Sequence, residues 1–161
     1  MLKSKRTSLL LSFFIPVLIV TGYVIIRGFA PFGSSSILTV DMGQQYVDFF
    51  AYFRNMLFHD PSGILYSFEK GFGGDMFGTW SYYLMSPANL ILLFFSQSQL
   101  PSVLAVITIL KYGLAGLSFA TLLVFGKQRL NFYIPGFAVA YSLMGWMVAN
   151  QLNTLWVDGV I

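Results

Sequence analysis

The stretch TVDMGQQYVDFFAYFRNML, residues 39–57, decides how the rest of the chain is interpreted. From Tyr46 onward its apolar residues recur at intervals of three and four, which is the spacing of one face of a helix. Polar side chains fall on or near the other face. The pattern predicts an amphipathic helix over residues 42–58 that lies on a membrane surface or on other helices, and that does not span the membrane.

Asp41 stands directly before this helix and is the first candidate for chemistry. Gln44 follows three residues later, which is the spacing of a capping box, in which the side chain at the helix start accepts a backbone N–H. Two interpretations of Asp41 therefore stay open. It is either a helix cap or a carboxylate that is held ready for function.

The composition is that of a membrane protein. Of the 161 residues, 57% are hydrophobic, 18% are aromatic and 9% are charged, against roughly 25% charged residues in soluble domains. The net charge is +3, and Lys3, Lys5 and Arg6 at the N-terminus indicate orientation in a membrane and no nucleic-acid partner. The chain has no cysteine and one histidine, so a metal ion would need oxygen ligands.

Three apolar stretches are predicted to form transmembrane helices, at residues 9–26, 101–125 and 132–149. A cleaved signal peptide is the alternative for the first stretch, although no small-x-small cleavage pattern follows it. The positive-inside tendency places residues 1–8 and the loop 126–131, which holds Lys127 and Arg129, in the cytoplasm.

The remaining segments, residues 27–100 and 150–161, are then expected outside the cytoplasm. Residues 84–95 are apolar but too few for a span, so we expect them to dip into the outer leaflet. If they cross instead, the topology of the later helices inverts. GFGGD at residues 71–75 lacks the Lys-Ser/Thr of a phosphate loop and is expected to form a turn.

Lys111 falls in the middle of the predicted helix 101–125. A charge at that depth is costly unless it is paired or lines an aqueous cavity. Contact with an anion such as a lipid phosphate, and snorkelling of the side chain towards water, both stay open. Asp158, near the end of the chain, is predicted to emerge on the same side as Asp41, so two carboxylates are expected at one membrane surface.

Three motifs carry a family resemblance. They are D-x-x-x-Q-Y at residues 41–46, G-x-D-x-x-G-T-W-S-Y-Y-x-x-S-P-x-N at residues 73–89, and W-x-D at residues 156–158. On these motifs the chain resembles the N-terminal part of the bacterial membrane protein family YfhO, over nearly its whole length. Members of that family are several times longer, and the sequence stops inside an apolar segment, so we expect it to be a fragment.

The family is similar to the GT-C class of glycosyltransferases. The resemblance therefore implies an all-α, multi-spanning fold, of which this chain supplies the N-terminal part, in a bacterial cell membrane. It implies transfer of a sugar from a polyprenyl-phosphate carrier to lipoteichoic acid or a related cell-wall polymer. It also implies an essential acid in the first outer loop, and Asp41 is the matching position. In some GT-C relatives a second acid helps to bind a divalent cation, whereas several enzymes of the class need no metal. The resemblance therefore leaves two alternatives open, no cofactor, or Mg²⁺ or Mn²⁺ with Asp41 and Asp158 as ligands.

Such a transfer needs a general base for the acceptor hydroxyl and cations for the leaving phosphate. We assign the base to Asp41. The candidates for binding substrate are Gln45, Tyr46, Arg54, Tyr82, Tyr83, Asn89, Lys111 and Asp158. The alternatives are a transporter or flippase for a lipid-linked sugar, with Lys111 and Ser86-Pro87 along its path, and a non-catalytic membrane scaffold. The isolated fragment is expected to be inactive.

Overall fold

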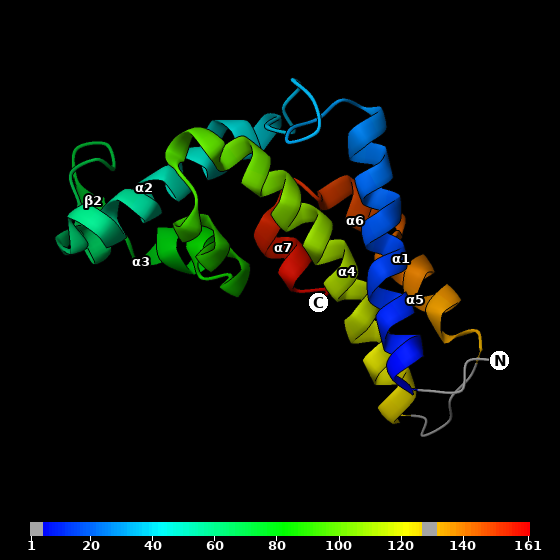
Figure 1. Cartoon of the computed structure of the whole chain (residues 1–161). Helices are drawn as coiled ribbons and strands as arrows, with labels where there is room; N and C mark the ends of the chain where they lie inside the picture. The colour runs from blue at the N-terminus through cyan, green and yellow to red at the C-terminus, as the bar shows by residue number, and fades with distance from the viewer. Residues whose placement is uncertain (1–4, 127–131) are drawn as a thin grey trace.

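The structure is a computed structural model, which describes residues 5–126 and 132–161. Helical segments dominate it, with one short hairpin (Figure 1). The elements in chain order are α1 (Lys5–Ile26), η1 (Met42–Tyr46), α2 (Val47–His59), η2 (Pro61–Ile64), β1 (Tyr66–Ser67), β2 (Gly74–Asp75), α3 (Phe77–Thr79), η3 (Trp80–Leu84), η4 (Pro87–Phe94), η5 (Gln97–Gln99), α4 (Leu100–Gly126), α5 (Ile134–Ser142), α6 (Gly145–Asn150) and α7 (Thr154–Asp158).

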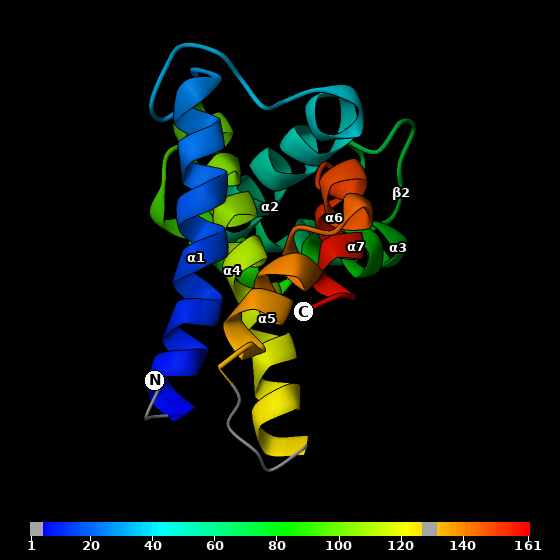
Figure 2. The same cartoon turned by 90° about the vertical axis from the view of Figure 1, so that its right-hand side faces the viewer.

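Two of the described helices, α1 and the continuous segment Gln97–Gly126 that contains α4, are long and apolar enough to cross a membrane. At about 1.5 Å per residue, α1 and α4 measure roughly 33 and 40 Å, which exceeds the roughly 30 Å of a hydrocarbon core. They pack side by side along much of their length, and α5 covers both of them (Figure 2). The sequence predicted these two helices at 9–26 and 101–125, within a few residues of their bounds.

Small side chains allow α1 and α4 to approach closely. Ser8 and Ser12 of α1 are fully buried, and the Ser12 hydroxyl donates to the Ser8 carbonyl at 2.8 Å. On α4, Gly113 faces Phe13 and Val17 of α1, and Gly116 faces Ser12. A Cβ added at Gly116 would overlap the carbonyl oxygen of Ser12, so the helix contact depends on the missing methyl group.

We expect Gly116→Ala to lower the free energy of unfolding by about 1–3 kcal/mol, the usual cost of overpacking, because backbone has to move to make room. Thermal unfolding in detergent measures the loss. Gly22→Ala on α1 is the matched control, since nothing lies within 4 Å of the added Cβ. Equal stability of the two variants would contradict the proposed close contact.

The predicted third span, residues 132–149, is not one continuous helix in the structure. It is divided into α5 and α6, and Met144 between them has extended backbone, with φ −59° and ψ 151°. Nine residues of α5 reach only about 14 Å. The helix ends because Ser142 and Gly145, both poor helix formers, flank the break. The expected loop residues Lys127 and Arg129 lie outside the described residues, as does Lys3.

The predicted helix 42–58 is present as η1 followed by α2, which ends at His59 before Pro61. Its apolar face is not left to lipid. Phe50, Phe53 and Met56 are buried in a core shared with η4 and the start of α4. Of the two environments that the sequence allowed, packing against other helices is therefore the one in the structure.

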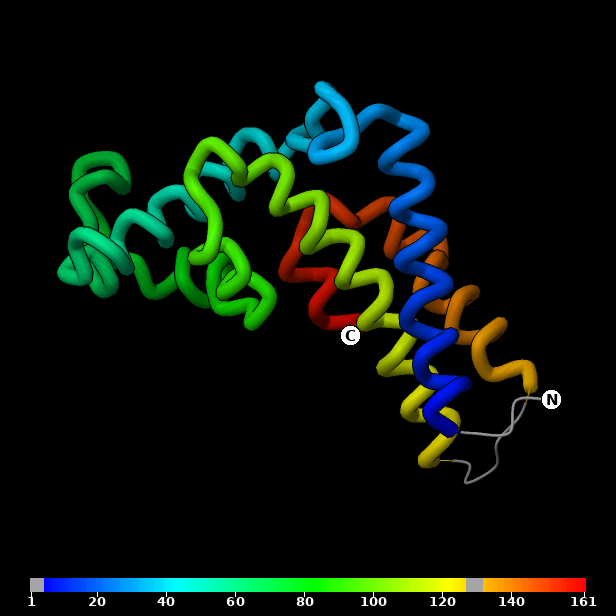
Figure 3. The backbone as a smooth tube through the Cα atoms, viewed as in Figure 1, coloured from blue at the N-terminus to red at the C-terminus, as the bar shows by residue number. Residues whose placement is uncertain are grey.

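The segment 84–95 forms η4, a 3-10 helix of eight residues. At about 2 Å per residue it extends roughly 16 Å, which is too short to span a membrane. It returns the chain to the beginning of α4. The last residues, which hold α6 and α7, run back along α4 towards η3, so three distant parts of the chain meet there (Figure 3).

Candidate functional site

Asp41 stands at the junction between the loop 27–40 and η1. Its backbone is already helical, with φ −60° and ψ −33°, and its side chain makes no capping hydrogen bond. The capping box that Asp41 and Gln44 suggested is therefore not formed. The carboxylate is partly exposed and is not used to hold the helix.

The residue before Asp41 has an unusual backbone. Val40 has φ +49°, the left-handed region that β-branched residues avoid. Such a conformation costs about 1–2 kcal/mol for a residue with a Cβ. Strained backbone of this kind concentrates at functional sites, where the surrounding structure fixes a side chain in a required position. Here the strained residue directly precedes the candidate base.

Tyr46 lies one turn after Asp41 and is 1% exposed. Its ring packs edge-on against Tyr83, with ring centres 4.9 Å apart, and its hydroxyl has no hydrogen-bond partner. Burial raises the pKa of this hydroxyl most, followed by the effect of Tyr82 and Tyr83. The negative charges of Asp41 and Asp158 add to the rise in pKa. Tyr46 is thus a neutral donor near both carboxylates.

A chain of polar contacts connects η1, η3 and α7. The Tyr83 hydroxyl donates to the Gln45 side chain at 2.8 Å, and the Tyr82 and Tyr83 rings lie 4.7 Å apart, edge to face. Trp156 Nε1 donates to the Tyr82 hydroxyl at 3.0 Å. Burial raises the pKa of Tyr83, and Tyr82 and then Asp41 raise it further. Residues of all three sequence motifs therefore lie in one cluster, which we call the polar cluster: Asp41, Gln45, Tyr46, Tyr82, Tyr83, Lys111, Trp156 and Asp158.

Lys111 and Asp158, both members of the polar cluster, form an ion pair. Lys111 Nζ lies 2.6 Å from Asp158 Oδ1 and donates to the Thr154 carbonyl at 2.7 Å. The lysine side chain is 2% exposed, so it neither snorkels to water nor faces a lipid phosphate, the two alternatives expected from the sequence. The second oxygen of Asp158, Oδ2, is buried and has no partner.

Two of the expected binding residues do not present a polar group to the cluster. Arg54 Nε donates to the carbonyl of Phe95, and its guanidinium lies over the Phe58 ring at 5.3 Å. Asn89 is buried and donates to the carbonyls of Tyr83 and Leu84, at 3.2 Å each. Arg54 therefore attaches α2 to the end of η4, and Asn89 acts indirectly by fixing the turn that carries Tyr83.

Trp156 and Thr154 were not among the expected site residues. The W-x-D motif pointed to Trp156, but only its partner Asp158 was selected. Nothing in the sequence marks Thr154, because its contribution to Lys111 is a backbone carbonyl.

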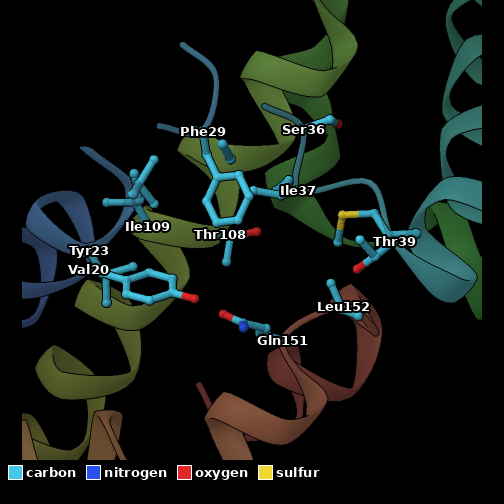
Figure 4. Close-up of a pocket in the computed structure, with 13 residues that line it drawn as sticks. Val20, Tyr23, Phe29, Ser36, Ile37, Thr39, Thr108, Ile109, Gln151 and Leu152 are labelled. Carbon is cyan, nitrogen blue, oxygen red and sulfur yellow. The ribbon is translucent and has the colours of Figure 1, made fainter. Parts of the chain in front are cut away.

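A cavity of about 190 Å³ adjoins the polar cluster on the side of α1 and α4. Thr39 and Met42, the neighbours of Asp41 in sequence, contribute to its wall, whereas Asp41 itself does not. Most of the wall is apolar, and the side chains of Tyr23 and Gln151 face each other across it (Figure 4). This cavity is thus beside the candidate base, and we place the chemistry at the polar cluster because that is where the carboxylates are.

The carboxylates of the described residues do not make a divalent-cation site by themselves. No group of three or more acids and histidines is close enough in residues 5–126 and 132–161 to hold a metal ion. Asp41 and Asp158, the expected ligands of Mg²⁺ or Mn²⁺, are only two, and Lys111 already pairs with one of them. We therefore assign no step to a metal ion.

A comparison with protein-family models matches residues 12–161 to the family described as "Bacterial membrane protein YfhO". Neither the curated proteins nor the solved structures contain a match to the chain.

Proposed function

Because the chain belongs to the YfhO family of bacterial membrane proteins, we propose that it supplies the base and part of the sugar site of a membrane glycosyltransferase. The donor is a sugar on a polyprenyl phosphate. The acceptor is a hydroxyl of lipoteichoic acid or a related cell-wall polymer outside the cytoplasm. One observation carries the proposal: Asp41 has a carboxylate that caps no helix, beside strained backbone, within a cluster of hydroxyl and amide groups.

Asp41 is the general base of the proposed reaction. As the acceptor oxygen bonds to the anomeric carbon, Asp41 takes the proton of that hydroxyl. The bond between the anomeric carbon and the phosphate oxygen breaks, and the electron pair leaves with the phosphate. A direct displacement of this kind inverts the anomeric centre and needs one base, which fits a site with one unpaired and partly exposed carboxylate.

The groups around Asp41 suit a ligand rich in hydroxyls. The Gln45 amide and the Tyr82 hydroxyl are exposed and can donate and accept, while the Tyr46 hydroxyl and Asp158 Oδ2 are buried without partners. A buried polar atom without a hydrogen-bond partner destabilises the protein, so these atoms favour binding of a ligand that forms hydrogen bonds with them. Sugar hydroxyls supply both the donors and the acceptors that these atoms lack.

The phosphate of the donor requires positive charge from another source. Lys111 forms an ion pair with Asp158, and Arg54 Nε donates a hydrogen bond to the carbonyl of Phe95. Lys70 Nζ donates a hydrogen bond to the carbonyl of Asp75 at 2.7 Å. Arg54 and Lys111 are the two cations among the substrate-binding candidates that the sequence suggested. We therefore propose that other cationic side chains complete the phosphate site.

A transfer assay tests the proposal. Full-length protein is reconstituted in vesicles with a polyprenyl-phosphate carrier whose sugar is tritium-labelled, and with lipoteichoic acid as acceptor. We expect the label to enter the polymer, and a water-soluble nucleotide sugar not to replace the lipid donor. Label that changes leaflet without entering the polymer would overturn the transferase and support the flippase. If the label neither enters the polymer nor changes leaflet, the result would support the non-catalytic scaffold.

A further inference from the structure

The hairpin formed by β1 and β2 carries an unusual amount of exposed apolar surface. We call residues 64–77 the aromatic hairpin. Its exposed large side chains are Ile64, Leu65, Tyr66, Phe68, Phe72 and Phe77. At the tip, Phe68 is 78% exposed and Phe72 is 105% exposed. Contiguous apolar surface of this kind marks an interaction site.

The aromatic hairpin is a formed structure that holds these rings outward. Gly71 and Gly73 adopt positive φ, +62° and +104°, and so close the tip. Lys70 Nζ donates across the tip to the Asp75 carbonyl at 2.7 Å, and the Met76 amide donates to the Leu65 carbonyl at 2.8 Å. Because the backbone is fixed in this way, Phe72 does not fold back onto the protein.

The position of the aromatic hairpin relates it to the membrane. It lies at the far end of α2, to the side of the α1 and α4 pair, level with the end at which α4 begins (Figures 1 and 3). Since α4 measures roughly 40 Å against a hydrocarbon core of about 30 Å, that end reaches the headgroup region. η4 packs against both α2 and α4 and also exposes apolar side chains, Leu90 and Phe94.

We propose that the aromatic hairpin inserts Phe68 and Phe72 into the headgroup region of the leaflet at that end of α4. The chemistry favours this depth. Aromatic rings are stable at the boundary between headgroups and acyl chains. Glu69 and Lys70, between the two rings in sequence, are exposed and stay hydrated there, whereas the hydrocarbon core would exclude their charges. The proposal does not depend on the proposed sugar transfer.

Site-directed spin labelling tests the depth of the aromatic hairpin. A nitroxide is attached to Phe72→Cys or Phe68→Cys in the full-length protein, in a background without other cysteines, and the protein is placed in liposomes. The nitroxide's collision rates with oxygen, which concentrates in lipid, and with a water-soluble nickel chelate are compared. Leu18→Cys, on the exposed side of α1, is the lipid control, and Ser34→Cys in the loop 27–40 is the polar control.

We expect both hairpin labels to favour oxygen over nickel several-fold more than the Ser34 label does, at a shallower depth than the Leu18 label. Labels that collide with nickel as often as the Ser34 label would place the tip in water and overturn the proposal. Labels that collide with neither reagent would also overturn it, because protein would then cover the hairpin. Phe72 is fully exposed, so its replacement leaves the fold unchanged.

Discussion

Asp41→Asn is expected to reduce sugar transfer by the full-length protein by a factor of about 10²–10⁴, the usual contribution of a general base. The amide has nearly the shape of the carboxylate but cannot take the acceptor proton. Because the Asp41 side chain caps no helix, the substitution removes no contact that η1 depends on. The initial rate of label transfer to lipoteichoic acid measures the effect, with the yield of folded protein measured in parallel.

Asp48→Asn is the matched control for this variant. Asp48 is the next acid along the same helical segment, is exposed, and lies outside the polar cluster. Its replacement changes the net charge by the same amount, so it reports any general effect of charge near the membrane. We expect it to transfer at the normal rate. Equal rates for the Asp41 variant, the Asp48 variant and the unchanged protein would rule out Asp41 as the base.

The long apolar helices were predictable because a single property, the length of an uninterrupted apolar run, determines them. An uninterrupted apolar run that is long enough to cross a bilayer has few alternatives to helix, and α1 and α4 follow it closely. The stretch 132–149 has the same composition, but composition does not show where a helix breaks. The break depends on the local preferences of Ser142 and Gly145, which weigh little in a count of apolar residues.

Most members of the polar cluster, though not Trp156, were predictable from the sequence, whereas the contacts between them were not. The motifs pointed to Asp41, Gln45, Tyr82, Tyr83 and Asp158, and the structure brings them together. The individual roles depend on partners far away in sequence, as between Tyr82 and Trp156, which are 74 residues apart. The sequence pattern could not show that Arg54 donates a hydrogen bond to the carbonyl of Phe95, because tertiary packing decides that contact.

Lys111→Met is expected to lower the free energy of unfolding by about 3–5 kcal/mol, the usual cost of removing one partner of a buried ion pair. The substitution leaves the Asp158 carboxylate and the Thr154 carbonyl without their shared donor. We expect the lower end of that range, because the Asp158 side chain is 24% exposed and water reaches part of it. Thermal or denaturant unfolding of the purified protein in detergent gives the measurement.

The double variant Lys111→Met/Asp158→Leu removes both charges of the ion pair and replaces them with apolar side chains of similar volume. A buried ion pair adds little stability over apolar side chains of similar volume, so we expect the double variant to regain most of the loss. A double variant as unstable as the single one would show that Lys111 acts mainly through the Thr154 carbonyl. Transfer activity then distinguishes stability from function: if Asp158 Oδ2 binds the sugar, the restored double variant folds but transfers slowly. Because apolar side chains of similar volume would stabilise the fold about as well as this ion pair, stability alone does not explain the presence of Asp158.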